Sequence, residues 1–343
     1  MSVVLVTGGA GYVGSHAVLA LAAAGDDVVV YDDLSAGHAE AVEQIQRAFP
    51  ARSISLVRGD ILEGPRLTKT LREHGATTVM HFAARLLVGE SVGDPLGYYR
   101  VNVTGTLTVL GAMAAAGVKR FVFSSTAATF GEPQTTPIDE THPQRPINPY
   151  GETKLAVERA LPHIEKAVGI RWMALRYFNA SGADPAGRIG EDHDPEEHLI
   201  PRALAAVAGG PPLTLFGDDY PTPDGTCIRD FIHVADLADA HVAALRALEA
   251  GAPSSAYNLG NGQGVSVRQL VESVERTTGQ RVPHTVGPRR PGDPARLVAS
   301  SERIRRELQW RPRLAALDDI VRTAWAWHRR HPRGYEVDET WQD

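Results

Sequence analysis

The sequence predicts an α/β protein with a doubly wound parallel sheet, followed by a smaller mixed α/β lobe. Two observations carry this prediction. An apolar run leads directly into a glycine turn and then into a helical pattern, as a buried parallel strand does where it meets a helix. Strand and helix patterns then alternate along the first half of the chain, which favours parallel strands joined by right-handed crossovers. The apolar run is residues 3–6, and the glycines are Gly8, Gly11 and Gly14.

The elements of the first half follow from short apolar runs and from the residues that bound them. Proline stands near the first turn of two expected helices, where its missing N–H costs nothing, and Gly117 ends one of them. We expect strands at 3–6, 28–31, 54–57, 78–82, 120–125 and 171–176. We expect helices directly after the glycine turn and at 65–74, 95–116 and 150–168.

The pattern changes after Asn179, where residues 180–198 have little periodicity and are predicted to form an irregular loop. Helices are expected at 199–208, 235–250, 270–278, 303–309 and 317–328, and strands at 213–216, 231–234, 257–259 and 296–299. We therefore divide the chain into a dinucleotide-binding domain, 1–180, and a substrate-binding domain, 181–343. Part of 235–265 is a candidate to return to the first domain.

The glycine turn and the residues after the second strand predict a dinucleotide site. A helix N-terminus offers unpaired N–H groups and a positive dipole end to a phosphate, and glycines let the backbone approach it. Asp32 and Asp33 follow the strand at 28–31. A carboxylate there binds both hydroxyls of an adenosine ribose and repels a 2′-phosphate, so we predict NAD rather than NADP.

Several candidate residues fall at or just past the ends of predicted strands. Ligands of doubly wound sheets bind at the carboxyl ends of the strands, so one crevice can gather these residues. They are Gly8, Asp32, Asp60, Ala83, Ser124 and Tyr177.

Tyr150 and Lys154 stand four residues apart at the start of a predicted helix, so both side chains lie on one face. A nearby ammonium and a positive nicotinamide ring would lower the pKa of the phenol. Tyr150 could then take a proton from a sugar hydroxyl while a hydride leaves the same carbon. A hydroxyl of the segment Ser124 to Thr126 can bond the reacting oxygen.

Several charged residues of the second half are candidate ligands of a substrate or of a metal. Arg229 and Arg290 are candidates for a substrate pyrophosphate, because a guanidinium pairs well with phosphate oxygens, and Asp293 could accept from ribose hydroxyls. The thirteen histidines show no metal-ligand spacing. The run Asp192-His193-Asp194 resembles a ligand set, but a polar loop is the better interpretation, and we predict no metal site.

The composition excludes several classes of protein. The chain has 343 residues and a net charge of −6, without a basic stretch of the kind that follows a nucleic-acid backbone. No apolar run reaches the roughly 18 residues of a membrane span. Cys227 is the only cysteine, so no intramolecular disulfide can form. We expect a cytoplasmic protein with no nucleic-acid or membrane partner.

The motifs together resemble those of the UDP-glucose 4-epimerases, within the extended short-chain dehydrogenase/reductase family. The resemblance runs nearly from end to end, and the G-x-x-G-x-x-G spacing is typical of that family. The matching segments include TGGAGYVGSH (7–16), YDDLSAGH (31–38), HFAA (81–84), FSST (123–126), NPYGETK (148–154), LRYFNASGA (175–183), FGDDYPTPDGTCIRDFIHVADLADAH (216–241), YNLGNG (257–262) and RRPGDPA (289–295).

The resemblance implies a Rossmann-like fold, a tightly held NAD and a homodimer paired through helices near 98–116 and 150–168. It also implies reversible epimerisation of UDP-glucose and UDP-galactose at C4 through a 4-keto intermediate. The implied catalytic residues are Tyr150, Lys154 and Thr126. Those implied for NAD are Gly8, Gly11, Tyr12, Val13, Gly14, Asp32, Asp33, Leu34, Asp60, Ile61, Phe82, Ala83, Ala84, Asn102, Ser124, Tyr150, Lys154 and Tyr177. Those implied for the UDP-sugar are Thr126, Tyr150, Asn179, His198, Leu199, Phe216, Arg229, Arg290, Asp293 and Leu297.

Departures from the family pattern concern the sugar. His198 stands where many members have Asn, and Leu297 stands where a bulky Tyr excludes N-acetyl sugars and a small residue admits them. Leu is intermediate, so weak turnover of the N-acetyl pair is expected. The alternatives are a sibling 4-epimerase acting on a UDP-N-acetylhexosamine, UDP-glucuronate or a UDP-pentose, and a non-catalytic NAD-sensing protein of the same fold. Sensing proteins typically lose the Tyr or the Lys, and both are present here.

Overall fold

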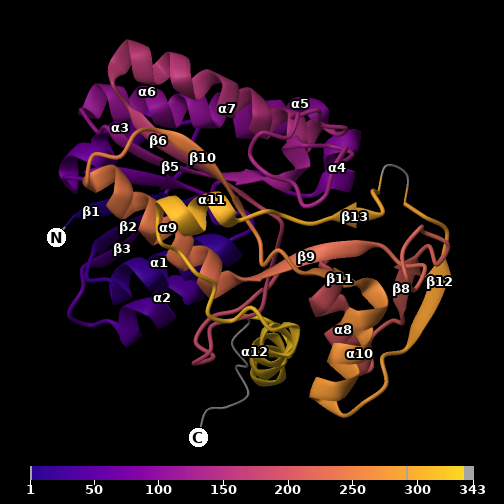
Figure 1. Cartoon of the computed structure of the whole chain (residues 1–343). Coiled ribbons are helices and arrows are strands. Elements are labelled where there is room, and N and C mark those ends of the chain that lie inside the picture. Colours follow the sequence, from indigo (N-terminus) through magenta and orange to yellow (C-terminus); the bar gives the residue numbers. More distant parts are fainter. Residues whose placement is uncertain (1, 291–292, 336–343) are drawn as a thin grey trace, which may run out of the picture.

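A seven-stranded parallel sheet forms the centre of the protein (Figure 1). The computed structural model describes residues 2–290 and 293–335. The strand order β10-β6-β5-β4-β1-β2-β3 places β1 inside the sheet with crossovers on both sides, as in a doubly wound, Rossmann-like fold. The strands are β1 (Val3–Thr7), β2 (Asp27–Asp32), β3 (Ile54–Arg58), β4 (Thr78–His81), β5 (Arg120–Thr126), β6 (Arg171–Tyr177) and β10 (Ser255–Leu259).

Helices cover both faces of this sheet, because its strands are apolar on both sides. Val4, Val6 and Val28 pack on one face, against α1 (Tyr12–Ala23), α2 (Ala39–Ala48) and α9 (Val234–Glu249). Leu5, Val29 and Phe121 pack on the other face, against α3 (Gly64–Glu73), α6 (Thr106–Ala116) and α7 (Pro149–Val168). The chain leaves this layer near residue 180 and returns to it with α9 and β10.

The prediction of one continuous helix at 95–116 is wrong. The structure has α4 (Val88–Gly93), α5 (Pro95–Tyr98), a π-helical stretch η1 (Tyr99–Gly105) and then α6. The side chain of Asn102, inside η1, bonds Arg85 and Thr153 from two other segments. The wider π-helical turn makes room for these bonds to other segments. The spacing of apolar residues in the sequence does not predict such a turn.

The second lobe carries two smaller sheets (Figure 1). In one, β9 (Ile228–His233) pairs with β7 (Asn179–Ser181), β11 (Gly264–Ser266) and β13 (Arg296–Leu297). In the other, β8 (Leu213–Phe216) pairs with β12 (His284–Gly287). Helices α8 (Leu199–Val207), α10 (Val267–Thr278) and α12 (Leu317–Arg330) complete an apolar core there, and α11 (Glu302–Glu307) lies beside β10.

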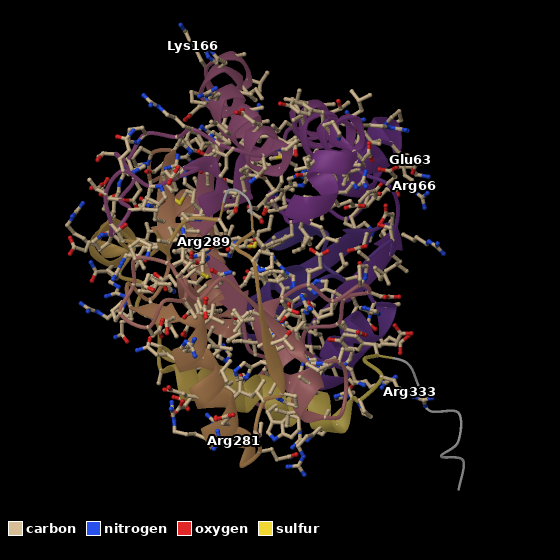
Figure 2. The ribbon with its side chains drawn as sticks, turned by 90° about the vertical axis from the view of Figure 1, so that its right-hand side faces the viewer. Glu63, Arg66, Lys166, Arg281, Arg289 and Arg333 are labelled. Carbon is tan, nitrogen blue, oxygen red and sulfur yellow. The ribbon has the colours of Figure 1, made fainter. Side chains whose placement is uncertain are left out.

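The prediction had not included the helices α2 and α4 or the strands β7, β11 and β12. In Figure 2, Lys166 at the end of α7 and Arg281 before β12 lie at opposite ends of the molecule, and Arg289 after β12 lies between them. Among the described residues no helix is both long and apolar enough to span a membrane.

Candidate active site

The glycine turn after β1 has the shape of an anion cradle. Gly8 has φ +70°, and a Cβ there would overlap the backbone of Ala83. A Cβ at Gly14 would overlap the carbonyl oxygen of Gly8. Gly11 precedes α1 without a side-chain cap, so the helix start offers its N–H groups to a ligand. Only glycine suits positions 8 and 14, which accounts for the first and third glycines of the sequence pattern.

Asp32, at the end of β2, braces this turn. One carboxylate oxygen accepts from the backbone N–H of Ala10 at 2.9 Å and the other from that of Leu34 at 2.9 Å. Burial raises the pKa of Asp32, and these two bonds oppose the shift. Each carboxylate oxygen keeps a further lone pair, so the group can also accept from ribose hydroxyls.

Tyr150 and Lys154 lie on the first turns of α7, facing the end of β5. Asn148 caps the helix by accepting from the N–H of Gly151 at 2.8 Å, and Pro149 starts it, as the sequence pattern indicates. The Thr126 side chain lies close to the Tyr150 phenol and acts to lower its pKa. The Lys154 ammonium donates to the carbonyl oxygen of Ser124 at 2.9 Å. The three predicted catalytic side chains therefore gather at one strand end.

The pKa of Tyr150 differs from the sequence expectation. Burial raises the pKa of this phenol, and the neighbouring Thr126 side chain offsets only part of the shift. Lys154 is occupied with Ser124 O, and burial lowers the pKa of its ammonium to about 7. The protein alone therefore keeps Tyr150 protonated, and the expected lowering of its pKa requires further positive charge.

A buried charge network supports this strand end. The Glu158 carboxylate accepts from Arg176 Nε at 3.0 Å and Nη2 at 2.6 Å, and from the hydroxyl of Ser125 at 2.5 Å. Glu158 is 6% exposed and Arg176 is 7% exposed. The network ties α7 to β5 and β6, one helical turn beyond Lys154. Sequence reasoning missed it, because the partners come from three separate elements.

The second lobe brings its candidate residues to the pair β9–β13. Leu297 lies beside Arg229 in the strand register, and Arg229 is ion-paired with Asp293. The Arg290 guanidinium stacks 4.1 Å from the centre of the Phe216 ring. Pro291 and Gly292, between Arg290 and Asp293 in the sequence, lie outside the described residues. Leu297 also packs on a small apolar cluster that includes Ala127, next to Thr126.

Comparison with known proteins shows the family of this chain. Residues 4–260 match the model of the "NAD dependent epimerase/dehydratase family". The chain belongs to this family. A UDP-glucose 4-epimerase of Halalkalibacterium halodurans is 49% identical over 336 residues, covering 98% of each chain.

Two solved structures extend the likeness to the whole fold of this epimerase/dehydratase family member. The UDP-glucose 4-epimerase of Brucella ovis in complex with NAD has a TM-score of 0.90 and 49% identity, with 95% of this chain and 98% of that chain covered. The enzyme from Stenotrophomonas maltophila with bound NAD and formylated UDP-arabinopyranose has a TM-score of 0.94 and 43% identity, with 97% and 99% covered.

The other predicted cofactor residues lie at strand ends of the central sheet. Asp60 and Ile61 follow β3, the segment 82–84 follows β4, and Ser124 and Tyr177 end β5 and β6. The Ser124 and Tyr177 hydroxyls lie 2.5 Å apart. Tyr12 and Val13 start α1, and Asp33 and Leu34 follow β2. The sheet of this epimerase/dehydratase family member thus gathers them along one edge.

The side-chain amide of Asn102 is already hydrogen-bonded within the protein. Its Oδ1 accepts from the N–H of Arg85 at 2.8 Å, and its Nδ2 donates to Arg85 O at 3.0 Å and to Thr153 Oγ1 at 3.1 Å. These bonds fasten the loop after β4 to η1 and α7. Asn102 therefore holds the cofactor edge in place through its neighbours. Arg85 itself is ion-paired with Glu90 and Asp94.

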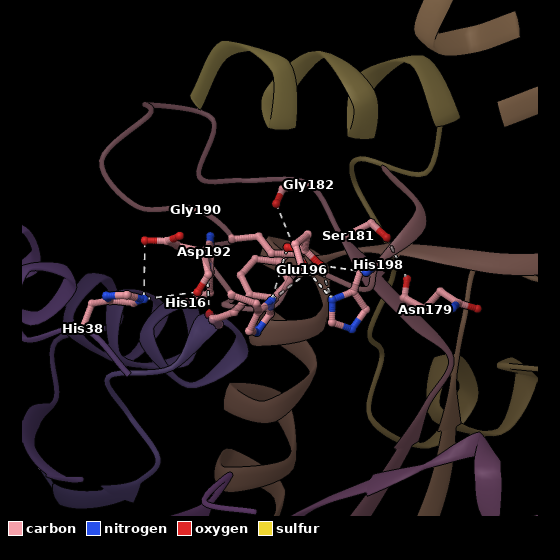
Figure 3. Close-up of polar contacts among 12 residues, drawn as sticks. His16, His38, Asn179, Ser181, Gly182, Gly190, Asp192, Glu196 and His198 are labelled. Carbon is pink, nitrogen blue, oxygen red and sulfur yellow. Dashed lines mark hydrogen bonds and ion pairs between the residues drawn. The ribbon is translucent and has the colours of Figure 1, made fainter. Parts of the chain in front are cut away.

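The segment between β7 and α8 holds a group that sequence reasoning missed. His198 faces Glu191 and Glu196 rather than standing free beside Leu199. Although burial favours the neutral ring, these carboxylates raise the pKa of His198 to about 10. Asp192 turns away from His193 towards His38 (Figure 3). The signal in the sequence was the alternation of acids and histidines from 191 to 198, of which only the first half was considered.

Proposed function

We propose that this protein interconverts UDP-glucose and UDP-galactose at C4 of the hexose, with a resident NAD. The observation that carries the proposal is the placement of Tyr150, Thr126 and Lys154 at a strand end of the sheet whose first turn is the glycine cradle. Relatives named UDP-glucose 4-epimerase support this substrate pair over the sibling sugars weighed from the sequence.

The glycine cradle and Asp32 fit a dinucleotide. The start of α1 would bind the pyrophosphate through the N–H groups of Tyr12 and Val13, and Asp32 would bind the adenosine ribose. Lys154, next to Ser124 O, would hold the nicotinamide ribose. When bound, NAD⁺ supplies the hydride acceptor for C4 of the sugar and its reduced form returns the hydride.

Tyr150 acts as the general base and then as the general acid. In its phenolate form, Tyr150 would take the proton of the sugar O4 while C4 gives up its hydride to the nicotinamide, which leaves a 4-keto sugar. The Thr126 hydroxyl aligns the shared proton. Positive charge from Lys154 and from the cofactor lowers the pKa of Tyr150, against the effect of burial. The keto sugar then turns over, and Tyr150 returns the proton to O4.

The second lobe anchors the UDP while the hexose turns. Arg229 and Arg290 supply guanidinium groups for the pyrophosphate, and Asp293 accepts from ribose hydroxyls. Asn179, His198, Leu199 and Phe216 come from the segments that border this side. Leu297 lies between Arg229 and the cluster beside Thr126, a position from which it can limit the size of the sugar.

Conversion of UDP-galactose by the purified protein without added NAD tests the function. We expect steady formation of UDP-glucose, and release of NAD on acid denaturation in about one equivalent per chain. UDP-N-acetylgalactosamine should turn over about tenfold or more slowly, since Leu297 leaves limited space for the N-acetyl group. No conversion of UDP-galactose, with or without NAD, would refute the proposed function.

The same assay with Leu297→Gly tests whether the side chain of Leu297 causes the slow turnover of the N-acetyl sugar. The variant should raise the rate on the N-acetyl sugar relative to UDP-galactose, whereas Leu297→Tyr should lower it. Equal wild-type rates on both sugars would show that Leu297 sets no limit.

We propose that a second copy of the chain covers an exposed apolar face of the first lobe. The side chains of Val92 on α4, Leu96 on α5 and Leu107 on α6 are 67%, 83% and 43% exposed. Apolar surface of this extent on one side of a protein marks an interface. Leu107 lies in the segment 98–116, which the family resemblance assigns to a homodimer, and Val92 and Leu96 lie just before that segment.

Leu96→Asp combined with Leu107→Asp is expected to halve the native mass measured by light scattering, because burying two carboxylates in the interface costs more than it gains. Val286→Asp is the matched control, since Val286 is 51% exposed on β12 in the other lobe. A control variant that dissociates equally, or a wild-type protein of one-chain mass, would contradict this assignment.

A further inference from the structure

Four side chains between β7 and α8 converge on one point. Glu191, His193, Glu196 and His198 each present one nitrogen or oxygen, and these four atoms lie within 4.8 Å of one another. Figure 3 shows Glu196 and His198 pointing towards each other beneath Gly182, with Asp192 directed to the opposite side. His198 is also one of the residues expected to contact the UDP-sugar, and it is the Nδ1 of its ring that faces the cluster. The other three are not among the residues assigned to the proton transfer, the dinucleotide cradle or the substrate.

The nitrogen and oxygen atoms of the cluster are grouped closely enough for small shifts to bring them around one ion. His198 Nδ1 lies 2.9 Å from Glu191 Oε1 and 3.0 Å from Glu196 Oε1. His193 Nδ1 lies 3.4 Å from Glu191 Oε1 and 3.6 Å from Glu196 Oε2. Zinc holds such ligands at about 2.1 Å, and tetrahedral geometry then places them about 3.4 Å apart.

Two of these atoms lack the hydrogen bonds that an ordinary polar loop would give them. Glu191 is only 4% exposed, and its Oε1 accepts no hydrogen bond among the described residues. His193 Nδ1 is buried and likewise has no hydrogen-bond partner in the described part of the chain. Both point into the cluster at ion-pair distance but with poor hydrogen-bond geometry. A buried carboxylate oxygen without a hydrogen bond is costly unless it is otherwise satisfied.

We propose that Glu191, His193, Glu196 and His198 form a binding site for a divalent transition-metal ion, with zinc as the best fit. Two imidazole nitrogens and two carboxylate oxygens suit zinc, whereas magnesium and calcium prefer oxygen ligands alone. Two carboxylates also balance the charge of a divalent ion. Four protein ligands leave no open position, so the site is structural.

The cluster lies next to the start of the dinucleotide-binding helix α1. The His193 ring packs edge-on against Tyr12, with ring centres 6.0 Å apart, and the Tyr12 hydroxyl donates to Gly182 O at 2.7 Å. Tyr12 begins α1, and His198 precedes Leu199 at the start of α8. The ion would therefore fasten the loop between the lobes to the start of the dinucleotide-binding helix.

Zinc titration of untagged full-length protein, first stripped with a chelator, tests this site. We expect one zinc per chain in competition with a chromophoric chelator, no comparable binding of magnesium, and visible bands of tetrahedral geometry when cobalt replaces zinc. Zinc should also raise the unfolding temperature, because it binds the folded chain. No uptake of zinc, or uptake without the cobalt bands, would overturn the proposal and leave two histidine–carboxylate ion pairs.

Glu196→Gln and Glu197→Gln form a matched pair of variants. Glu197 is the exposed neighbour outside the cluster, so its variant should bind zinc as the wild type does. Glu196→Gln should weaken zinc binding at least about tenfold and abolish the thermal shift. If Glu196→Gln folds poorly, His193→Gln provides the same comparison. Equal binding by the cluster variants and the control would place the zinc elsewhere and refute the site.

Discussion

Tyr150→Phe is expected to lower the rate of UDP-galactose conversion about 10²–10⁴-fold, while NAD still copurifies with the protein. The substitution removes only the phenolic oxygen, which lies beside Thr126 at the end of β5. Without that oxygen, the proton of the sugar O4 has no acceptor in line with the departing hydride. The measurement is the steady-state rate, together with the NAD released on acid denaturation.

Tyr257→Phe is the control for this experiment. It also removes one phenolic hydroxyl, which donates to Glu307 at 3.0 Å on the outer strand β10. Its rate should stay close to that of the wild type. A Tyr150→Phe variant that keeps more than a tenth of the wild-type rate would exclude Tyr150 as the general base.

Glu158→Ala is expected to destabilise the fold by about 3–5 kcal/mol, because it leaves the Arg176 guanidinium buried without its carboxylate. Arg176 is 7% exposed, so water cannot replace the lost partner without opening the site. The unfolding temperature should fall by roughly 6–15 °C. Activity should fall as well, since Ser125 loses its partner beside Ser124 and Thr126.

Two further variants test whether the loss of stability comes from the buried Glu158–Arg176 pair. Glu165→Ala, on the same helix but partly exposed, should change the free energy of unfolding by less than about 0.5 kcal/mol. Glu158→Leu combined with Arg176→Met should recover much of the stability, since it removes both charges together. Equal losses for Glu158→Ala and Glu165→Ala would show that the buried pair contributes little.

The second of these predictions could not have come from the sequence. Glu158 and Arg176 are separated by 18 residues along the chain, on a helix and on the next strand, and nothing in their spacing links them. The sequence did not predict the cluster of two glutamates and two histidines for a related reason. Glu191, His193, Glu196 and His198 lie in an irregular segment, where the fold rather than a helical or strand period sets which side chains meet.

The sequence by itself determined the parallel sheet, the glycine cradle with Asp32, and the Tyr150–Lys154 face of α7. Each depends on spacing within one element or across one turn, which backbone geometry converts directly into position. The tertiary structure alone decided three other features. They are the place of β10 beside β6, the π-helical break at Asn102, and the burial that raises the pKa of Tyr150. These depend on contacts between segments distant in sequence, and on how completely such contacts exclude water.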